Sequence, residues 1–300
     1  MRVLVFGNGF DLDLGLNTRY SDFAKSKEWI ELFERKNDND NCLSSYLYKK
    51  SKVDDWFNIE KSLKDYVKER ELKKDYDINM VYIDKWFLKE LEYTFDKYLA
   101  GELVLTPLRE NSLAALLMAT TNKHSCFDSI YSFNFVDYSI FNYIAINNMV
   151  KLDNVQFVHG LGHDLIFGID EDGCKTSDYS FLKKTMHPKY PSTNIIPDLM
   201  EAQEVVIFGH SLNEIDWKYF QSFFEDNCKY KVGNKKNITI ITKDDDSKKQ
   251  LKDNLYGFGI SITSLSSICN LVFVETDSYY HGDFEEKENV SDLLYRLSKQ

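Results

Sequence analysis

The chain has 300 residues, of which 37 are lysine or arginine and 48 are aspartate or glutamate, so its formal net charge is −11. A hydrophobic fraction of 43% and an aromatic fraction of 15% exclude an intrinsically disordered chain. The acidic balance argues against a protein that coats nucleic-acid duplexes, since phosphate contacts need clustered lysine and arginine. It leaves room for a small nucleotide at a local site, so we expect a small-molecule partner and no direct nucleic-acid partner.

The sequence also indicates a compartment. Its N-terminal apolar run, Val3–Phe6, is too short for a signal peptide or a membrane span, and no later run is long enough to cross a bilayer. The cysteines form no Cys-x-x-Cys pair, and their odd number argues against a disulfide framework. They are Cys42, Cys126, Cys174, Cys228 and Cys269. We therefore predict a cytoplasmic protein with no cysteine zinc site and no membrane partner.

Short runs of β-branched, aliphatic and aromatic residues predict the strands of a buried parallel sheet. These runs are Val3–Phe6, Ile130–Phe133, Val155–Val158, Val205–Phe208 and Ile238–Thr242, followed by a weaker one at Leu271–Glu275. Helical patterns lie between them, which is typical of an α/β fold in which helices flank the sheet. We predict a Rossmann-like fold of this class.

A long helical stretch separates the first strand from the second. Apolar residues recur at helical spacing in Ile59–Val67 and again in Trp86–Leu99, and Asn111 is expected to cap a helix over Ser112–Ala119. Further helices are predicted over Asn213–Asp226, Ser247–Leu255 and Val290–Leu297.

These elements predict a discontinuous domain organisation. Residues 1–20 and 125–275 would form a nucleotide-binding core, and residues 21–124 a helical insertion after the first strand. Residues 276–300 would form a C-terminal tail with a short helix.

Glycine or polar residues follow the predicted strands. Gly7 follows the first, Asn134 the second and His159 the third. Gly209 follows the fourth. Because ligands of open parallel sheets bind beyond the carboxyl ends of the strands, we expect these residues to share one cleft.

The first strand runs into Gly7-Asn8-Gly9 and then a predicted helix. Glycines let backbone N–H groups approach a pyrophosphate, and a helix N-terminus favours an anion. The spacing departs from the Rossmann G-x-G-x-x-G, and the charge of Asp11 would repel phosphate. A nucleotide site and a plain strand-to-helix turn capped by Asp11 therefore both remain open.

Asn134 and His159 are the candidates for catalysis. An amide can hold a ribose hydroxyl or a water, because it both donates and accepts, and Asp137 would orient Asn134 or cap the next helix. A histidine at a strand end is a candidate general base. For either residue alone, an asparagine turn or a packed structural histidine is the commoner role.

The fourth strand ends at Gly209-His210-Ser211. Ser211 would bind a phosphate or a ribose, unless it or Asn213 simply caps the following helix. Asp216, one turn into that predicted helix, would face either the cleft or solvent.

Taken in order, these motifs resemble the bacterial abortive-infection AbiH family of phage-defence proteins. Residues Gly7–Leu12 and Leu16–Phe23 resemble the N-terminal signature of that family, and Trp56–Glu60 and Ile166–Asp170 resemble its later motifs. The resemblance covers nearly the whole chain. It implies a role in antiviral defence. The partners that it implies are further copies of the same chain, in a homo-oligomer, and a phage-encoded trigger.

That family in turn resembles sirtuin-like NAD-binding domains, which carry a glycine loop, a strand-end asparagine, a His-Gly pair and a later Gly-x-Ser. This second resemblance implies a sirtuin-like core with NAD as its substrate. Related domains in other defence proteins hydrolyse NAD to nicotinamide and ADP-ribose. The missing cysteine set argues against protein deacylation, and no metal is expected.

The resemblance also implies roles for single residues. Asn134 would orient a water or a ribose hydroxyl, and His159 would accept a proton. The glycine loop would hold the pyrophosphate, and Arg19 would offset Asp11. The residues expected to contact NAD are Gly7, Asn8, Gly9, Phe10, Asp11, Arg19, Asp137, Gly209, Ser211 and Asp216.

Two other functions remain open. One is a sensor that binds NAD or ADP-ribose without hydrolysing it. The other is a metal-dependent nuclease or phosphohydrolase that would use Asp11, Asp13, Asp137 and His163.

Overall fold

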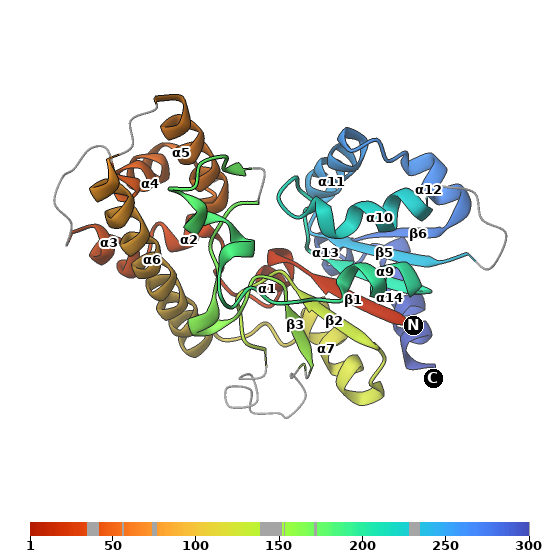
Figure 1. The fold of residues 1–300 in the computed structure, drawn as a ribbon. Coiled ribbons are helices and arrows are strands. Elements are labelled where there is room, and N and C mark those ends of the chain that lie inside the picture. The colour runs from red at the N-terminus through yellow and green to blue at the C-terminus, as the bar shows by residue number, and fades with distance from the viewer. Residues whose placement is uncertain are drawn as a thin grey trace. The chain divides into compact units, whose positions relative to one another are not determined.

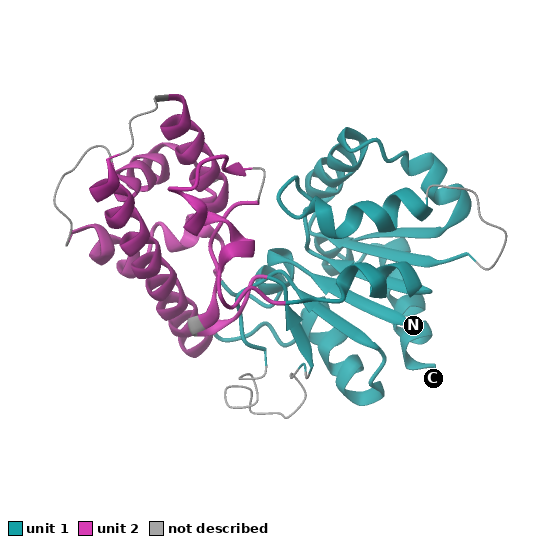
Figure 2. Ribbon diagram, in the orientation of Figure 1, with its two compact units in different colours: residues 1–16, 107–158, 192–300 teal, residues 17–106, 159–191 magenta. Residues whose placement is uncertain are grey.

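The computed structural model describes residues 1–34, 42–55, 57–73, 77–138, 152, 154–170, 173–227 and 235–299, and for residues 73 and 163 only the backbone. The chain divides into two compact units (Figure 2). Unit 1 comprises Met1–Leu16, Pro107–Val158 and Ser192–Gln300, and unit 2 comprises Asn17–Thr106 and His159–Pro191.

Unit 1 is built on a six-stranded parallel sheet with the order β3-β2-β1-β4-β5-β6 (Figure 1). The strands are β1 (Arg2–Phe6), β2 (Ser129–Ser132), β3 (Val155–Phe157), β4 (Glu204–Phe208), β5 (Asn237–Thr242) and β6 (Asn270–Glu275). In register, Leu4 of β1 lies between Ile130 of β2 and Val206 of β4. The predicted parallel sheet is confirmed, including its weaker sixth strand.

Helices cover both faces of this sheet, because its central strands are apolar on both sides. On one face, a hydrophobic cluster joins Val5, Ile207 and Ile240 to four helices. These are α9 (Ile195–Glu201), α10 (Trp217–Asn227), α11 (Asp245–Gly257) and α12 (Ile262–Ile268). On the other face, the ring of Phe10 packs on Phe6 and Phe208. The remaining helices of unit 1 are α1 (Asn8–Asp13), α7 (Leu113–His124), α13 (Thr276–Tyr280) and α14 (Phe284–Ser298).

Unit 2 is helical in the residues described. Its helices are α2 (Tyr20–Phe23), α3 (Lys27–Glu34), α4 (Leu43–Val53), α5 (Ile59–Lys73) and α6 (Ile78–Leu105), followed by short 3₁₀ turns at Gly162–Asp164, Ser180–Leu182 and Lys184–Met186. Aromatic rings fill its core, with Phe23 against Trp29 and Phe95 against Phe167. The helical stripes predicted around Ile59 and Trp86 are confirmed as α5 and α6, while Trp56 lies outside the described residues.

Three predicted helix boundaries are wrong. Ser112, not Asn111, caps α7, because its hydroxyl accepts the N–H of Ala115. The helix after β4 begins at Trp217 rather than Asn213, so Asp216 lies in the preceding turn. The last helix begins at Phe284, six residues before Val290, where the carboxylate of Asp283 accepts the N–H of Glu286.

The two units divide the chain differently from the predicted core and insertion. Residues 107–124, which include α7, belong to the unit that contains the sheet, and residues 159–191 belong to the helical unit. Among the helices described, none is long and apolar enough to cross a membrane. The cysteines within the described residues, Cys42, Cys126, Cys174 and Cys269, are free and buried, and Cys228 lies outside them.

Candidate functional site

The loops that follow β1 and β4 pack directly on each other. The N–H of Gly9 donates to the carbonyl of Gly209 at 2.9 Å, and the N–H of Gly7 donates to Phe208 at 3.0 Å. A Cβ atom on Gly9 would lie 2.6 Å from the Cα of Gly209, which is closer than real Cβ contacts allow. Gly209 itself has a φ of +62°, a conformation that side chains disfavour. Glycine is therefore required here by the contact between the loops.

This packing affects the backbone N–H groups that were predicted to bind a pyrophosphate. The N–H of Phe10 donates to the carbonyl of Gly7 at 2.9 Å, so the N–H groups of Gly7, Gly9 and Phe10 all have partners within the protein. Helix α1 that follows is only six residues long. A strand-to-helix turn is sufficient to explain the glycine pattern, and the pyrophosphate site at this loop stays a prediction.

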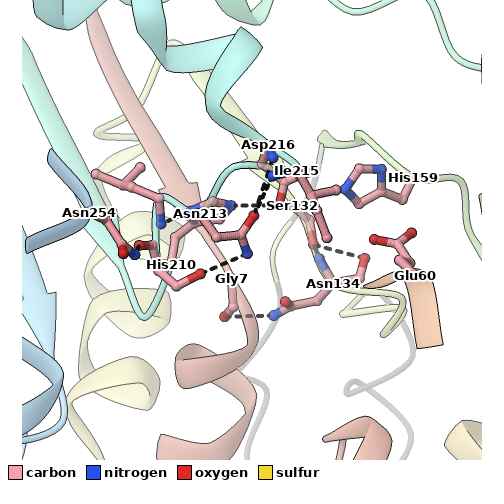
Figure 3. Close-up of polar contacts among 12 residues, drawn as sticks. Gly7, Glu60, Ser132, Asn134, His159, His210, Asn213, Ile215, Asp216 and Asn254 are labelled. Atoms are coloured by element: carbon pink, nitrogen blue, oxygen red, sulfur yellow. Dashed lines mark hydrogen bonds and ion pairs between the residues drawn. The ribbon is translucent and has the colours of Figure 1, made fainter. Parts of the chain in front are cut away.

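The carboxamide of Asn134, which follows β2, contacts the backbone of the β1 loop at Gly7 (Figure 3). Its Nδ2 atom donates to the carbonyl of Gly7 and to the phenol of Tyr138, each at 2.9 Å. The phenol of Tyr138 in turn donates to the carboxylate of Asp11. Asn134, Tyr138 and Asp11 are 5%, 0% and 1% exposed, so this chain of hydrogen bonds is fixed inside unit 1.

Burial and the neighbouring charge of Asp11 raise the pKa of the Tyr138 phenol well above its usual range. The phenol therefore keeps its proton and remains a donor to Asp11. Phe10, predicted to contact NAD, is 0% exposed and belongs to the core instead. Asn8 and Asp137 are half-buried, and the helix that Asp137 was expected to cap lies outside the described residues.

His210 and Asp216 organise the loop after β4, a role that the sequence analysis missed. The Nδ1 atom of His210 accepts the N–H of Leu212 at 3.0 Å, and its Nε2 atom lies 3.4 Å from the carboxylate of Asp216. Both side chains are buried. The two residues lie in the irregular segment between β4 and α10, where no helical or strand period sets the direction of side chains, so no sequence pattern pointed to this pair.

The β4 loop is held in a strained conformation by further contacts. Leu212 has a φ of +48°, which is unfavourable for a side chain of its size, yet it is fully buried. The amide of Asn254 donates to the carbonyl of Ser211 at 2.9 Å, and the Oδ1 atom of Asn213 accepts the N–H of Ile215 at 2.9 Å (Figure 3). This turn at Asn213 explains why α10 begins late. The loop leaves Ser211 exposed at its tip.

Two of the predicted site residues, His159 and Arg19, belong to unit 2. His159 is 3% exposed, and its Nδ1 atom lies 3.4 Å from the Nζ atom of Lys184. Lys184 forms an ion pair of 2.8 Å with Glu60. Arg19 is exposed at the start of α2. The convergence of His159 and Arg19 with the residues of unit 1 stays a prediction.

The contact with Lys184 bears on which nitrogen of the His159 ring carries a proton. An ammonium group can only donate, so if Lys184 donates to Nδ1, a neutral ring carries its proton on Nε2. In this state His159 can donate a hydrogen bond through Nε2, whereas the predicted proton acceptor would need a lone pair there.

The carboxylates proposed for a metal site have other partners. Asp13 accepts the N–H of Ala114 at 2.8 Å and the phenol of Tyr280 at 2.6 Å, and burial raises its pKa. Among the described residues, no group of three or more histidine, cysteine, aspartate or glutamate side chains is arranged to hold a metal. The side chain of His163 lies outside that description.

The family model described as Bacteriophage abortive infection AbiH matches residues 3–241, most of the chain and all strands from β1 to β5. The chain belongs to the AbiH family. Its membership places it in the abortive-infection defence of bacteria against phage. No curated protein and no solved structure matches it significantly.

Proposed function

We propose that this AbiH-family protein binds NAD at the carboxyl ends of β1 and β4 and hydrolyses its nicotinamide–ribose bond during phage defence. The strand order β3-β2-β1-β4-β5-β6 carries the proposal. It is the order of doubly wound dinucleotide-binding sheets, in which the ligand lies where the order reverses, between the first and the fourth strand. The two packed glycine loops follow these two strands.

Within the proposed site, the β4 loop offers a better ligand for the phosphates of NAD than the β1 loop does. Since the N–H groups of Gly7 and Gly9 are engaged, the exposed hydroxyl of Ser211 is the better phosphate or ribose ligand. This hydroxyl accepts from Asn213 at 3.0 Å and can still donate its own proton.

Asn134 supports hydrolysis through its carbonyl oxygen. Cleavage of the nicotinamide–ribose bond develops positive charge on the ribose and releases a neutral base, so the protein has to position the ribose and one water. Because both N–H bonds of the Asn134 amide are directed at Gly7 and Tyr138, its Oδ1 atom would accept from that water or from a ribose hydroxyl. The buried network holds this oxygen in one orientation.

A non-catalytic sensor of NAD or ADP-ribose is the second candidate. The observation in its favour is that the histidine within the β4 loop, His210, has both ring nitrogens engaged by Leu212 and Asp216. A site in unit 1 with no general base would bind a dinucleotide without turning it over.

Calorimetry with NAD and ADP-ribose, combined with a nicotinamide-release assay, separates these functions. Ser211→Trp adds bulk at the exposed loop tip without touching the buried network and should abolish binding. The matched control Asn122→Ala changes an exposed residue of α7 and should bind like the wild type. Binding with nicotinamide release supports the hydrolase, and binding alone supports the sensor.

A resting defence hydrolase is expected to be restrained, so cellular NAD is also measured during phage challenge. Asn134→Ala should then preserve NAD if Asn134 positions the water. An absence of NAD binding, together with stable NAD in challenged cells, would overturn the proposal.

The role of His159 is tested by His159→Gln. Glutamine can accept from Lys184 and donate elsewhere, but it cannot take up a proton. If His159 is a general base, kcat should fall by about 10²–10⁴-fold with little change in KM. If it only donates a hydrogen bond, His159→Gln should retain most activity and His159→Phe should lose it.

A further inference from the structure

Unit 2 contains a cavity that the proposed NAD site does not use. It lies between α6 and the segment that runs from Phe181 to Lys189, and its volume is about 650 Å³. Pockets for small molecules typically measure about 300–1,000 Å³. The cavity is therefore large enough for a ligand such as a mononucleotide.

Fixed contacts hold the walls of this cavity. The carboxylate of Glu92, on α6, accepts the N–H of Phe167 at 3.1 Å. Backbone hydrogen bonds join Ile169 to Leu182 and to Lys184, and the buried ion pair of Lys184 with Glu60 anchors the same segment. The cavity is thus preformed, which lowers the entropy lost when a ligand binds.

The charged groups at the cavity are mostly basic, although the whole chain carries a net charge of −11. Lys85 and Lys89 line it from α6, and Lys189 lines it from the opposite segment. His187 lines it too, but burial lowers the pKa of its ring, so it adds no positive charge near neutral pH. Lys189 is paired with Asp164 at its rim. Glu92 is the acidic lining residue, and burial raises its pKa to about 7, so near neutral pH it is only partly ionised. Lys85 and Lys89 therefore leave a positive surplus that an anion can neutralise.

Apolar and aromatic side chains provide the rest of the lining. The side chains of Tyr93 and Met186 are 61% and 64% exposed, so packing in the core does not account for large apolar residues at these two positions. Phe181 and Leu88 line the cavity beside them. Lys85, Lys89 and Tyr93 are spaced by four residues along α6 and share one helix face. Lys89 is thus adjacent to both Lys85 and Tyr93 on this helix face.

We propose that this cavity binds a nucleoside monophosphate, with its phosphate at Lys85 and Lys89 and its base against Tyr93 and Phe181. A phosphate dianion matches two neighbouring ammonium groups, and a flat base matches the rings of Tyr93 and Phe181. The carboxyl of Glu92, which lines the same cavity, would hydrogen-bond the edge of the base. This ligand site lies within unit 2 and is independent of NAD hydrolysis.

Calorimetry with the full chain and the four common nucleoside monophosphates tests this site. Ribose 5-phosphate, which has no base, and adenosine, which has no phosphate, are the comparison ligands. We expect at least one monophosphate to bind about tenfold more tightly than either fragment. Equal binding of ribose 5-phosphate, or no binding of any monophosphate at millimolar concentration, would overturn the proposal.

Variants at exposed positions assign the two halves of the ligand. Lys85→Ala/Lys89→Ala should weaken the monophosphate about tenfold or more, while Lys61→Ala/Lys68→Ala, which removes the same charge from exposed positions of α5, should not. Tyr93→Ala should weaken the monophosphate about fivefold or more but leave ribose 5-phosphate unchanged. A loss of binding in the Lys61/Lys68 control as large as in the Lys85/Lys89 variant would show a nonspecific charge effect and reject the site.

Discussion

Both units contain a buried tyrosine that donates to a buried carboxylate, Tyr138 to Asp11 in unit 1 and Tyr66 to Asp84 in unit 2, but their other buried polar groups differ. In unit 1, polar groups at the strand ends hold backbone loops, as Asn134 holds the carbonyl of Gly7 and His210 holds the N–H of Leu212. In unit 2, a lysine and a carboxylate from distant segments are also buried together as an ion pair. Glu60 pairs with Lys184, and Asp84, which is 0% exposed, accepts from the phenol of Tyr66 at 2.6 Å.

This difference shows which interactions each unit depends on. Unit 1 depends on a close approach of backbone at Gly9 and Gly209, where no side chain fits. Unit 2 depends on charge compensation inside a helical core, where a lone charge would be costly. We therefore expect mutations to lower the free energy of unfolding by steric overlap in unit 1, and by leaving a buried charge without its partner in unit 2.

The largest effect is expected at the buried ion pair of unit 2. Lys184→Met leaves the buried carboxylate of Glu60 without its partner and should lower the free energy of unfolding by about 3–5 kcal/mol. The double variant Lys184→Met/Glu60→Gln should regain most of that loss, as measured by urea denaturation. Lys27→Met is the matched control, because its pair with Glu31 is largely exposed, and it should cost about 0.5 kcal/mol or less. A loss below about 1 kcal/mol for Lys184→Met would contradict the charge argument for unit 2.

The contact between the loops of unit 1 should give the next largest effect. Gly9→Ala places a Cβ 2.6 Å from the Cα of Gly209, so the two backbones have to separate, at a cost of about 3 kcal/mol. In contrast, Gly101→Ala lies in α6 with no atom within 4 Å of its Cβ and should stabilise the protein by about 0.5–1 kcal/mol. Thermal unfolding of both variants measures the difference. Equal stabilities would show that the loops tolerate separation.

Matched tyrosine substitutions compare the polar networks of the two units directly. Tyr138→Phe removes the donor to Asp11 in unit 1, and Tyr66→Phe removes the donor to Asp84 in unit 2. Each should cost about 2 kcal/mol, since a hydrogen bond to a buried carboxylate is lost. Tyr138 also accepts from Asn134, so only Tyr138→Phe should reduce NAD binding as well. An equal loss of NAD binding in Tyr66→Phe would remove the distinction between the networks.

The smallest effect is expected from the titration of Glu92. Burial raises its pKa from 4.5 to about 7, so the folded state takes up a proton more readily than the unfolded state. The stability from this protonation is present below pH 4.5 and is lost as the pH rises through about 7. Glu92→Gln should therefore be more stable than the wild type above pH 7, by about 1 kcal/mol after screening by solvent, and this advantage should vanish near pH 4.5. Unfolding curves across this pH range measure it, and a constant difference would contradict the raised pKa.

Local patterns in the sequence predicted the parallel sheet and most of the helices. The apolar runs of β1, β4 and β5 identify buried strands on their own, because a strand buried on both faces has to be apolar throughout. The helical stripe of α5 is equally local. The residues that follow these strands could also be named in advance, since the carboxyl ends of parallel strands lie at one edge of the sheet.

The partners of the buried polar groups could not be read from the sequence. The residues that meet at Lys184 come from positions 60 and 159, and those that meet at Asp84 come from positions 43, 66 and 179. No period connects such positions. The occupied N–H groups of the Gly7 loop likewise depend on how β4 lies beside β1.

The sequence by itself determined where the strands and most of the helices form and that the chain belongs to a phage-defence family, because these depend on neighbouring residues and on the order of motifs along the chain. Only the tertiary structure decided that Asn134 and His210 hold loops, that His159 is bound by Lys184, and that α6 borders a basic cavity. Each of these features arises from contacts between distant segments, and their free energy exists only once the chain has folded.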